Sequence, residues 1–178
     1  ATAYADAVGL YLGIALSRLT DITNTLCGWE VTKTQVRHLF TRHAVPMLWD
    51  YGENNVFGEA AGAYMVSLAN MAKALDNTPA FGEGTARQDD AQSQSISTGK
   101  LISTDPPYYD NIGYADLSDF FYVWLRRSLK PVFPDLFATL TVPKAEELVA
   151  TPYRHGSKEK AETFFLNGMT QAMHRLAK

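Results

Sequence analysis

The chain has 178 residues, 46% of them hydrophobic, which suits one ordinary domain. Its net charge of −3 excludes a broadly basic surface that could bind DNA by itself. No apolar run approaches the length of a membrane span and no signal-peptide pattern opens the chain, so we expect a cytoplasmic protein with no membrane contact. The single cysteine, Cys27, excludes an internal disulfide and a zinc ribbon, and we expect no metal site.

Residues 1–75 are predicted to be a helical segment. Apolar residues recur at helical spacing over residues 1–19, which predicts a first helix. Thr32 suits an N-cap, so a second helix is predicted to begin there and to end before Pro46. The same periodicity predicts a third helix over residues 61–75.

The composition changes at residues 76–100, which are rich in Gly, Ser, Thr, Asn, Gln and Asp. This stretch is predicted to be a long polar, exposed loop, with a brief strand end at residues 87–91. The apolar run at residues 101–104 then predicts a strand. Residues that follow such a strand lie at its carboxyl end, where open α/β sheets bind their ligands.

The remaining residues predict two helices and a weak strand. An amphipathic helix is predicted around residues 117–129, ended by Pro131, and residues 137–142 alternate weakly as a strand would. Ser157 is predicted to cap a last helix that is still periodic near Lys178. Because that helix lacks a stop signal and the chain begins without methionine, we expect an internal piece of a longer protein.

The predicted strand is followed directly by a four-residue motif that suits one chemical task, Asp105-Pro106-Pro107-Tyr108. An exocyclic amine on a nucleobase is a poor nucleophile, because its lone pair is delocalised into the ring. The Asp105 carboxylate and the Pro106 carbonyl can accept its two hydrogens, and successive prolines restrict the backbone that holds them. Tyr108 offers a flat face on which an extruded base can stack. A Pro-Pro turn with a surface tyrosine is the alternative.

Asp105-Pro106-Pro107-Tyr108 resembles the catalytic motif of the amino-methyltransferases, which methylate adenine N6 or cytosine N4 with S-adenosylmethionine. The longer run from Asp105 to Arg127 is similar to bacterial adenine-specific DNA methylases that carry a DUF1156 domain. The similarity extends over most of the chain, and it includes Leu26-Cys27-Gly28-Trp29, Pro46-Met47-Leu48-Trp49-Asp50 and Val142-Pro143-Lys144-Ala145-Glu146-Glu147-Leu148-Val149.

The resemblance implies an α/β fold. We expect a partial Rossmann-like class I methyltransferase core with a helix-rich N-terminal part. The catalytic-motif segment of that core would occupy residues 101–178, within one incomplete domain. The implied activity is methylation of adenine N6 in DNA, in restriction-modification or phage defence, with DNA and the remaining segments of the longer protein as partners.

Asp90 is the candidate contact to the cofactor, S-adenosylmethionine. It lies where related methyltransferases have an acidic residue followed by Ala, which accepts a hydrogen bond from the adenine amine of the donor; a solvated loop acid is the alternative. The glycine-containing stretches at residues 57–62 and 81–84 do not follow buried strands, so we interpret both as loops. The family's cofactor-binding glycine turn is therefore expected upstream, and binding of the methyl donor by this fragment alone is doubtful.

Tyr109, Asp110 and Asn111 are candidate substrate-binding residues, because they follow Tyr108 and Asn suits the hydrogen-bonding edge of adenine. A turn at Asn111 is the alternative. Candidates for contacts to the DNA backbone are Lys144, Arg154, His155 and Lys158.

Two other functions stay open at this point. The chain can be a non-catalytic folded fragment or interaction module, as the missing glycine turn suggests. It can also methylate cytosine N4 or an RNA base, because the same two acceptors suit any exocyclic amine.

Overall fold

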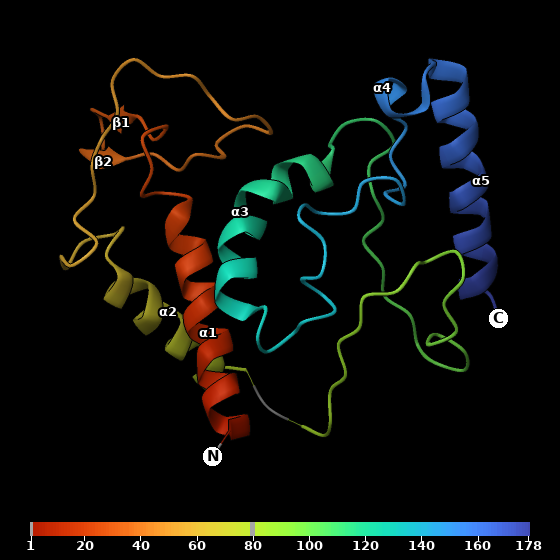
Figure 1. Ribbon diagram of the computed structural model, residues 1–178, viewed down its shortest axis with the longest axis horizontal. Helices are drawn as coiled ribbons and strands as arrows, with labels where there is room; N and C mark the ends of the chain where they lie inside the picture. Colours follow the sequence, from red (N-terminus) through yellow and green to blue (C-terminus); the bar gives the residue numbers. More distant parts are fainter. Residues whose placement is uncertain (1, 79–80) are drawn as a thin grey trace. The chain divides into compact units, whose positions relative to one another are not determined.

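A computed structural model of the chain describes residues 2–78 and 81–178, and its regular structure is mostly helical. Residue 1 of the predicted first helix and residues 79–80 of the predicted loop lie outside the described residues. In chain order the elements are α1 (Thr2–Thr20), β1 (Trp29–Glu30), β2 (Gln35–Val36), α2 (Tyr64–Asp76), α3 (Tyr114–Leu129), α4 (Pro152–His155) and α5 (Lys158–Leu176) (Figure 1).

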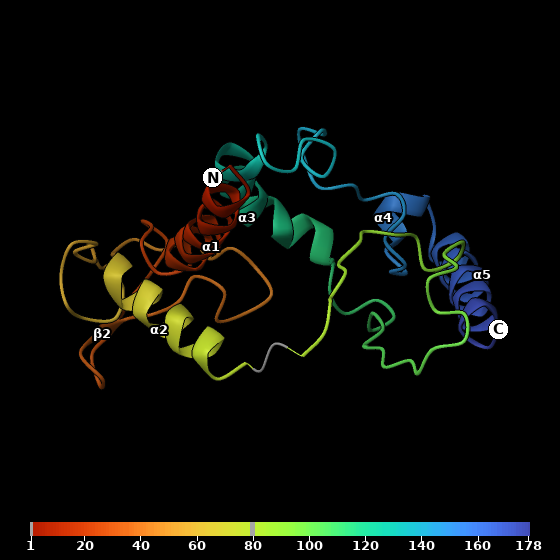
Figure 2. The ribbon, with the colours of Figure 1, turned by 90° about the horizontal axis from the view of Figure 1, so that it is seen from below.

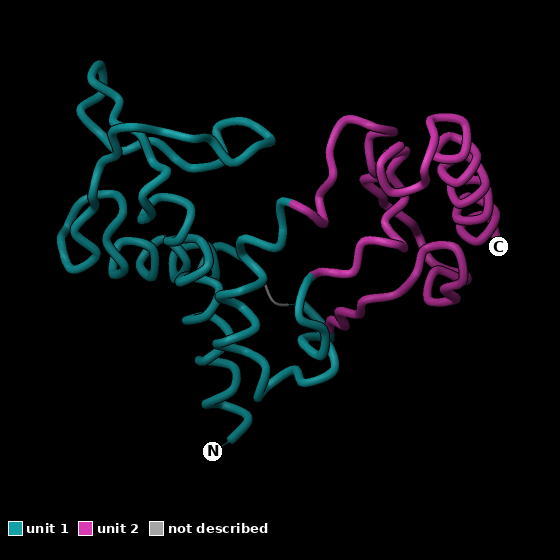
Figure 3. The backbone as a smooth tube through the Cα atoms, turned by 45° about the horizontal axis from the view of Figure 1, so that its top comes forward, with its two compact units in different colours: residues 1–83, 117–141 teal, residues 84–116, 142–178 magenta. Residues whose placement is uncertain are grey.

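The chain forms two compact units, each built from two separate stretches (Figure 3). Unit 1 comprises residues 1–83 and 117–141, and unit 2 comprises residues 84–116 and 142–178. The division predicted from the sequence uses three continuous segments, 1–75, 76–100 and 101–178. It stays a prediction.

The helices α1 and α2 pack against each other in unit 1, which confirms the first and third predicted helices. Side chains satisfy the carbonyls at the end of α1, where backbone acceptors lack helical partners. Thr23 Oγ1 donates to the Leu19 carbonyl at 2.9 Å, and Asn24 Nδ2 donates to the Thr20 carbonyl at 2.8 Å. These bonds end the helix and direct the chain into the next loop.

The helix predicted from Thr32 is wrong, because the structure forms an antiparallel hairpin there instead. β1 and β2 pair Trp29 with Val36, and Thr34 in the connecting turn has a φ of 49°. Val36 and Leu39 are three residues apart, as on one face of a helix. In the structure neither residue is helical, and both side chains are buried against Cys27. Tertiary burial therefore overrides the local pattern.

The amphipathic helix predicted around residues 117–129 is confirmed as α3, whereas the strand predicted over residues 137–142 is wrong. That stretch is irregular, and its carbonyls bind side chains of α3. The Tyr122 hydroxyl donates to the Thr139 carbonyl at 2.8 Å, and Arg126 Nε donates to the same carbonyl at 2.9 Å. Side-chain donors thus replace the neighbouring strand that a ladder would need.

Unit 2 contains α4 and α5, which lie side by side (Figure 2). Ser157 caps α5 as predicted, and its side chain accepts a hydrogen bond from the Lys160 amide at 3.2 Å. The predicted polar loop also contacts α5, because Arg175 Nε donates to the Gln92 carbonyl at 3.2 Å. No helix or strand is formed by the described residues 81–100, so the strand end predicted at residues 87–91 is wrong.

The strand predicted immediately before the motif is also wrong. Residues 101–104 form no ladder, and Leu101 is fully exposed. An extended segment needs a neighbouring strand to satisfy its backbone groups, and the described residues provide none beside it. Within those residues the one sheet is the β1–β2 hairpin, so the Rossmann-like core stays a prediction.

Candidate active site in unit 2

A cavity of about 330 Å³ brings together three of the four motif residues. Asp105, Pro106 and Pro107 line it, together with Tyr114 from the first turn of α3. Asp105 and Pro106 are exposed and Pro107 is half-buried. Both candidate acceptors for the amine, the Asp105 carboxylate and the Pro106 carbonyl, therefore belong to residues that border one cavity.

Tyr108 and Tyr109 have different surroundings because the chain turns sharply between them. The Asn111 amide donates to the Tyr108 carbonyl at 2.9 Å, and Tyr109 has a φ of 36°. A left-handed conformation is unusual for a bulky residue and marks local strain. The turn that was the alternative for residues 109–111 is thus formed. Tyr108 keeps 56% of its surface exposed beside it.

Tyr109 is held by two contacts to α5 and by one to the chain before α4. Its hydroxyl donates to Glu162 Oε1 at 2.8 Å, and its ring meets Phe165 edge-on with centroids 5.2 Å apart. Its carbonyl accepts a hydrogen bond from the Ala150 amide at 2.8 Å. The hydrogen bond to the Glu162 carboxylate raises the pKa of Tyr109. Tyr109 is therefore a structural anchor for the turn, and Asp110 and Asn111 are exposed beside it.

An ion-pair network holds the start of α3, where Tyr114 lines the cavity. The Arg154 guanidinium lies between two carboxylates and donates to both Glu147 and Asp116, the latter at 2.6 Å. Glu147 Oε1 also accepts a hydrogen bond from the Ala115 amide at 2.9 Å. Arg154 is 11% exposed and paired with both carboxylates, and the DNA-backbone contact predicted for it stays a prediction.

The network shifts the pKa values of its members in the directions that favour the ion pairs. The Tyr153 hydroxyl, which donates to Asp116, lowers the pKa of that carboxyl most, and Arg154 lowers it further against the opposing effect of burial. The same hydrogen bond raises the pKa of Tyr153. Burial acts to lower the pKa of Arg154, but its hydrogen bonds to Glu147 and Asp116 outweigh this and raise it.

Sequence reasoning missed Tyr114 and the network behind it. Tyr114 is nine positions beyond Asp105, and only its aromatic character gave a signal. Asp116 is 38 residues from Arg154 in the sequence, and Glu147 is seven residues from it without an intervening helix that would bring the two together. No local spacing therefore predicts that the three side chains meet.

Asp90 has a turn-forming role in the structure. Its Oδ1 accepts a hydrogen bond from the Gln92 amide at 2.9 Å, and its carbonyl accepts one from the Gln94 amide at 2.9 Å. Ser93 Oγ donates to the other carboxylate oxygen at 3.4 Å. The contact of Asp90 with S-adenosylmethionine stays a prediction.

No protein-family model matches the sequence, and comparisons with curated proteins and solved structures also give no match. Among the helices of the described residues, none combines the length and the apolar character needed to cross a membrane. Within the same part of the chain, no three His, Cys, Asp or Glu side chains cluster in a way that could hold a metal ion.

Proposed function

We propose that this chain holds the target amine during S-adenosylmethionine-dependent methylation of an exocyclic amine of a DNA base, namely adenine N6. The observation that carries the proposal is the cavity bordered by Asp105, Pro106, Pro107 and Tyr114. It combines a carboxylate, a restricted backbone carbonyl and an aromatic side chain at one place. These groups are the ones that binding an extruded base through its amine requires.

The chemistry follows from the two acceptors. A hydrogen bond from the amine to Asp105 and a second to the Pro106 carbonyl would localise the nitrogen lone pair and aim it away from both acceptors. Positive charge develops on nitrogen as the new bond forms, and the nearby carboxylate stabilises it. The two prolines limit backbone motion, so little reorganisation is needed when the base arrives.

Tyr108 and Tyr114 supply the apolar surface in this proposal. The exposed ring of Tyr108 stacks on the extruded base, and Tyr114 forms part of the cavity wall. The methyl donor is assigned to segments of the longer protein, as the resemblance implies, since Asp90 is engaged in a turn. A cytoplasmic location and a place in restriction-modification or phage defence belong to the same proposal.

The decisive variant is Asp105→Ala in the longer protein that contains this chain. We expect loss of methyl transfer to DNA by at least about 100-fold, with binding of the methyl donor retained. Asp135→Ala is the matched control, because Asp135 is an exposed acid of unit 1. Methyl transfer that survives Asp105→Ala at the control level would overturn the proposal.

A second candidate function is a non-catalytic fragment or interaction module. The turn-forming role of Asp90 favours it, because that carboxylate is used within the chain itself. Calorimetry with S-adenosylmethionine on the 178-residue chain measures whether the donor binds here. The catalytic function is separated from the fragment by methyl transfer in the longer protein, which a non-catalytic fragment would not lose in Asp105→Ala. Assays of the longer protein on adenine- or cytosine-containing DNA and RNA distinguish the base and nucleic acid.

A further inference from the structure

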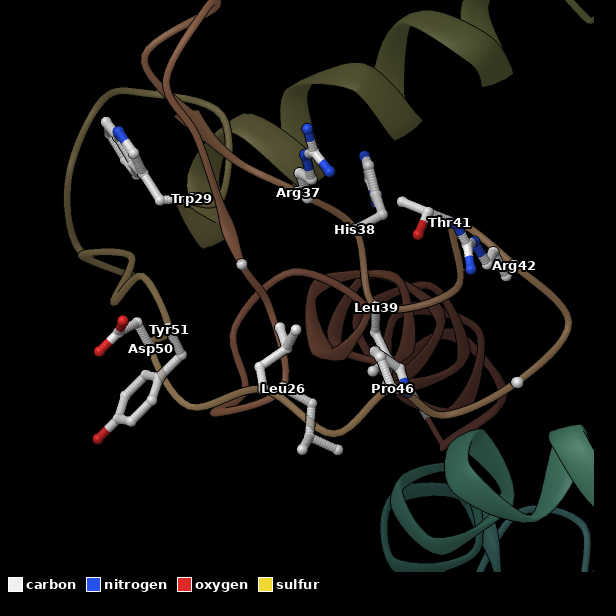
Figure 4. Close-up of a pocket in the computed structure, with 13 residues that line it drawn as sticks. Leu26, Trp29, Arg37, His38, Leu39, Thr41, Arg42, Pro46, Asp50 and Tyr51 are labelled. Atoms are coloured by element: carbon white, nitrogen blue, oxygen red, sulfur yellow. The ribbon is translucent and has the colours of Figure 1, made fainter.

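A cavity of about 590 Å³ lies in unit 1, at the β1–β2 hairpin and the chain that follows it (Figure 4). This volume is in the usual range of small-molecule sites, roughly 300–1,000 Å³. None of its lining residues belongs to the candidate active site of unit 2. It is therefore a separate place at which the protein can bind a ligand.

One side of the cavity is rich in hydrogen-bond donors. Figure 4 shows Arg37, His38, Thr41 and Arg42 along the same stretch of chain after β2. Two guanidinium groups and a hydroxyl are the donors that phosphate oxygens accept from most readily. Asp21 orients the imidazole of His38, because its Oδ2 lies 2.8 Å from Nδ1.

The rest of the cavity is suited to a flat, partly apolar group. Its lining includes the aliphatic side chains of Leu26, Leu39 and Leu48, and Leu39 is 1% exposed. Figure 4 also shows Trp29 on β1, with Asp50 and Tyr51 on the returning chain. Trp29 is 52% exposed, so its ring is free to stack on an aromatic ligand.

Backbone hydrogen bonds hold the walls together. The Arg37 amide donates to the Gly28 carbonyl at 2.8 Å, and the Gly52 amide donates to the Cys27 carbonyl at 2.9 Å. Gly52 also lies so close to Val36 that a Cβ there would be 2.7 Å from Val36 Cγ2. The returning chain that carries Asp50 and Tyr51 is thus fixed against the hairpin, and the cavity is built before any ligand binds.

The residues that line the cavity carry a net positive charge although the chain as a whole has a net charge of −3. Two arginines line it against one carboxylate, Asp50. Arg37 shares a long ion pair with Glu30, with Nε and Oε2 3.9 Å apart, and its side chain remains 56% exposed. Arg42 has no carboxylate partner within residues 2–78 and 81–178, so its charge is available to a ligand.

We infer that this cavity binds a nucleotide, with the phosphate against Arg37 and Arg42 and the base on the apolar floor beside Trp29. Asp50 can then accept a hydrogen bond from a base nitrogen. The ligand is either a free nucleotide or one nucleotide of a DNA single strand, since both present the same phosphate and base. This inference does not rest on the proposed methylation, because it uses other residues and another unit.

Calorimetry on the 178-residue chain tests the phosphate contact with deoxyadenosine 5′-monophosphate and deoxyadenosine as probes. We expect the monophosphate to bind about tenfold more tightly or better, because charge-assisted hydrogen bonds to the arginines need the phosphate. Arg42→Gln should lose about tenfold in affinity for the monophosphate and little for the nucleoside. Arg127→Gln, the same change at an exposed position of α3 outside the cavity, should leave both affinities unchanged.

A second variant, Trp29→Leu, tests the base contact independently. It should weaken the monophosphate and the nucleoside by the same factor, because stacking does not involve the phosphate. Circular dichroism of each variant checks that the fold is kept. Equal affinity for nucleoside and monophosphate, absence of binding by both, or equal losses in Arg42→Gln and Arg127→Gln would overturn the inference.

A single-stranded oligodeoxynucleotide distinguishes the two sources of the ligand. Tighter binding of the strand than of the monophosphate, with an affinity that falls steeply as salt rises, identifies a DNA strand. Equal or tighter binding of the monophosphate identifies a free nucleotide. Both results support the cavity as a nucleotide site, provided that Arg42→Gln weakens binding in each case.

Discussion

The Tyr109 hydroxyl donates a hydrogen bond of 2.8 Å to Glu162 Oε1, and this bond joins the turn after the motif to α5. The carboxylate stabilises the protonated phenol, so the pKa of Tyr109 is raised from the ordinary value of 10.0. We predict that Glu162→Gln returns this pKa toward that value. Nuclear magnetic resonance titration of ring-labelled tyrosine, with Tyr109→Phe to assign the signal, measures the change.

The sign of the pH effect on stability follows from the direction of this shift. A raised folded-state pKa means that the stabilising contribution is complete below the unfolded pKa and is lost as pH rises through the folded pKa. The stability difference between the native chain and Tyr109→Phe should therefore shrink in alkaline solution. Glu159→Gln, an equal change of charge on the first turn of α5, serves as the control. An unchanged Tyr109 titration in Glu162→Gln would contradict the hydrogen bond.

The contribution of Asp116 to stability has the opposite dependence on pH and is lost in acid solution. The Tyr153 hydroxyl and then Arg154 lower the pKa of Asp116 from 3.8, so its contribution is present above that value and is lost as pH falls through the folded pKa. Because the side chain is 42% exposed, solvent screening limits the contribution to about 1 kcal/mol or less. Urea unfolding of Asp116→Asn should show a deficit in stability at neutral pH that shrinks as the pH falls below the ordinary value of 3.8.

A second variant separates the hydrogen bond from the ion pair at this site. Tyr153→Phe removes the donor that lowers the pKa of Asp116 most, and it leaves Arg154 in place. The Asp116 pKa should rise toward its ordinary value without reaching it. Asp110→Asn is the control for loss of an exposed carboxylate in the same unit. If Asp110→Asn reproduces the pH dependence of Asp116→Asn, the effect is general and the assignment to Asp116 fails.

The sequence predicted those elements whose signal is local and strong. The helices α1, α2, α3 and α5 have apolar residues at helical spacing over three or more turns, and Ser157 caps the last of them. Cys27 is fully buried, and its pKa is raised mainly by that burial. Long periodic patterns suffice because helical hydrogen bonds form between near neighbours in the chain.

The elements that could not be predicted from the sequence depend on contacts with residues distant in the chain. The hairpin at residues 29–36 forms where a helix was predicted to begin, because Val36 and Leu39 are buried with Cys27, which lies outside the predicted helix. The run at residues 101–104 has strand-like composition, but no described strand pairs with it. Likewise the Asp105 cavity includes Tyr114, whose position depends on an ion pair between Arg154 and Glu147 that no motif encodes.

Gly168 illustrates how packing can outweigh helix propensity. Replacing a glycine inside a helix by alanine stabilises the helix by about 1 kcal/mol. At Gly168 in α5, however, the new Cβ would overlap Leu148 Cδ2 and approach Gln92 Oε1 at 3.2 Å. Overpacking of this kind costs about 1–3 kcal/mol, so we predict that Gly168→Ala is neutral to destabilising by about 2 kcal/mol.

Gly9→Ala is the matched comparison, because a Cβ at Gly9 in α1 meets nothing within 4 Å. This variant should be more stable than the native chain by up to about 1 kcal/mol. Urea unfolding measures both free energies. A stabilised Gly168→Ala would mean that Leu148 moves aside without cost. The packing of α5 against Leu148 would then be looser than the contact indicates.

Substitutions of Tyr108 test whether an extruded base stacks on its ring at the motif. Tyr108 is 56% exposed, whereas its neighbour Tyr109 is anchored by Glu162 and Phe165, so the two rings have separate roles. Under the proposed function, Tyr108→Phe should retain methyl transfer by the longer protein, because phenylalanine keeps the aromatic face. Tyr108→Ala should lose about 1–3 kcal/mol of binding to the extruded base, or roughly tenfold to a hundredfold in kcat/KM. Steady-state kinetics on a DNA substrate measure this difference. Equal losses in both variants would instead assign the role of Tyr108 to its hydroxyl, and equal retention would place the base elsewhere.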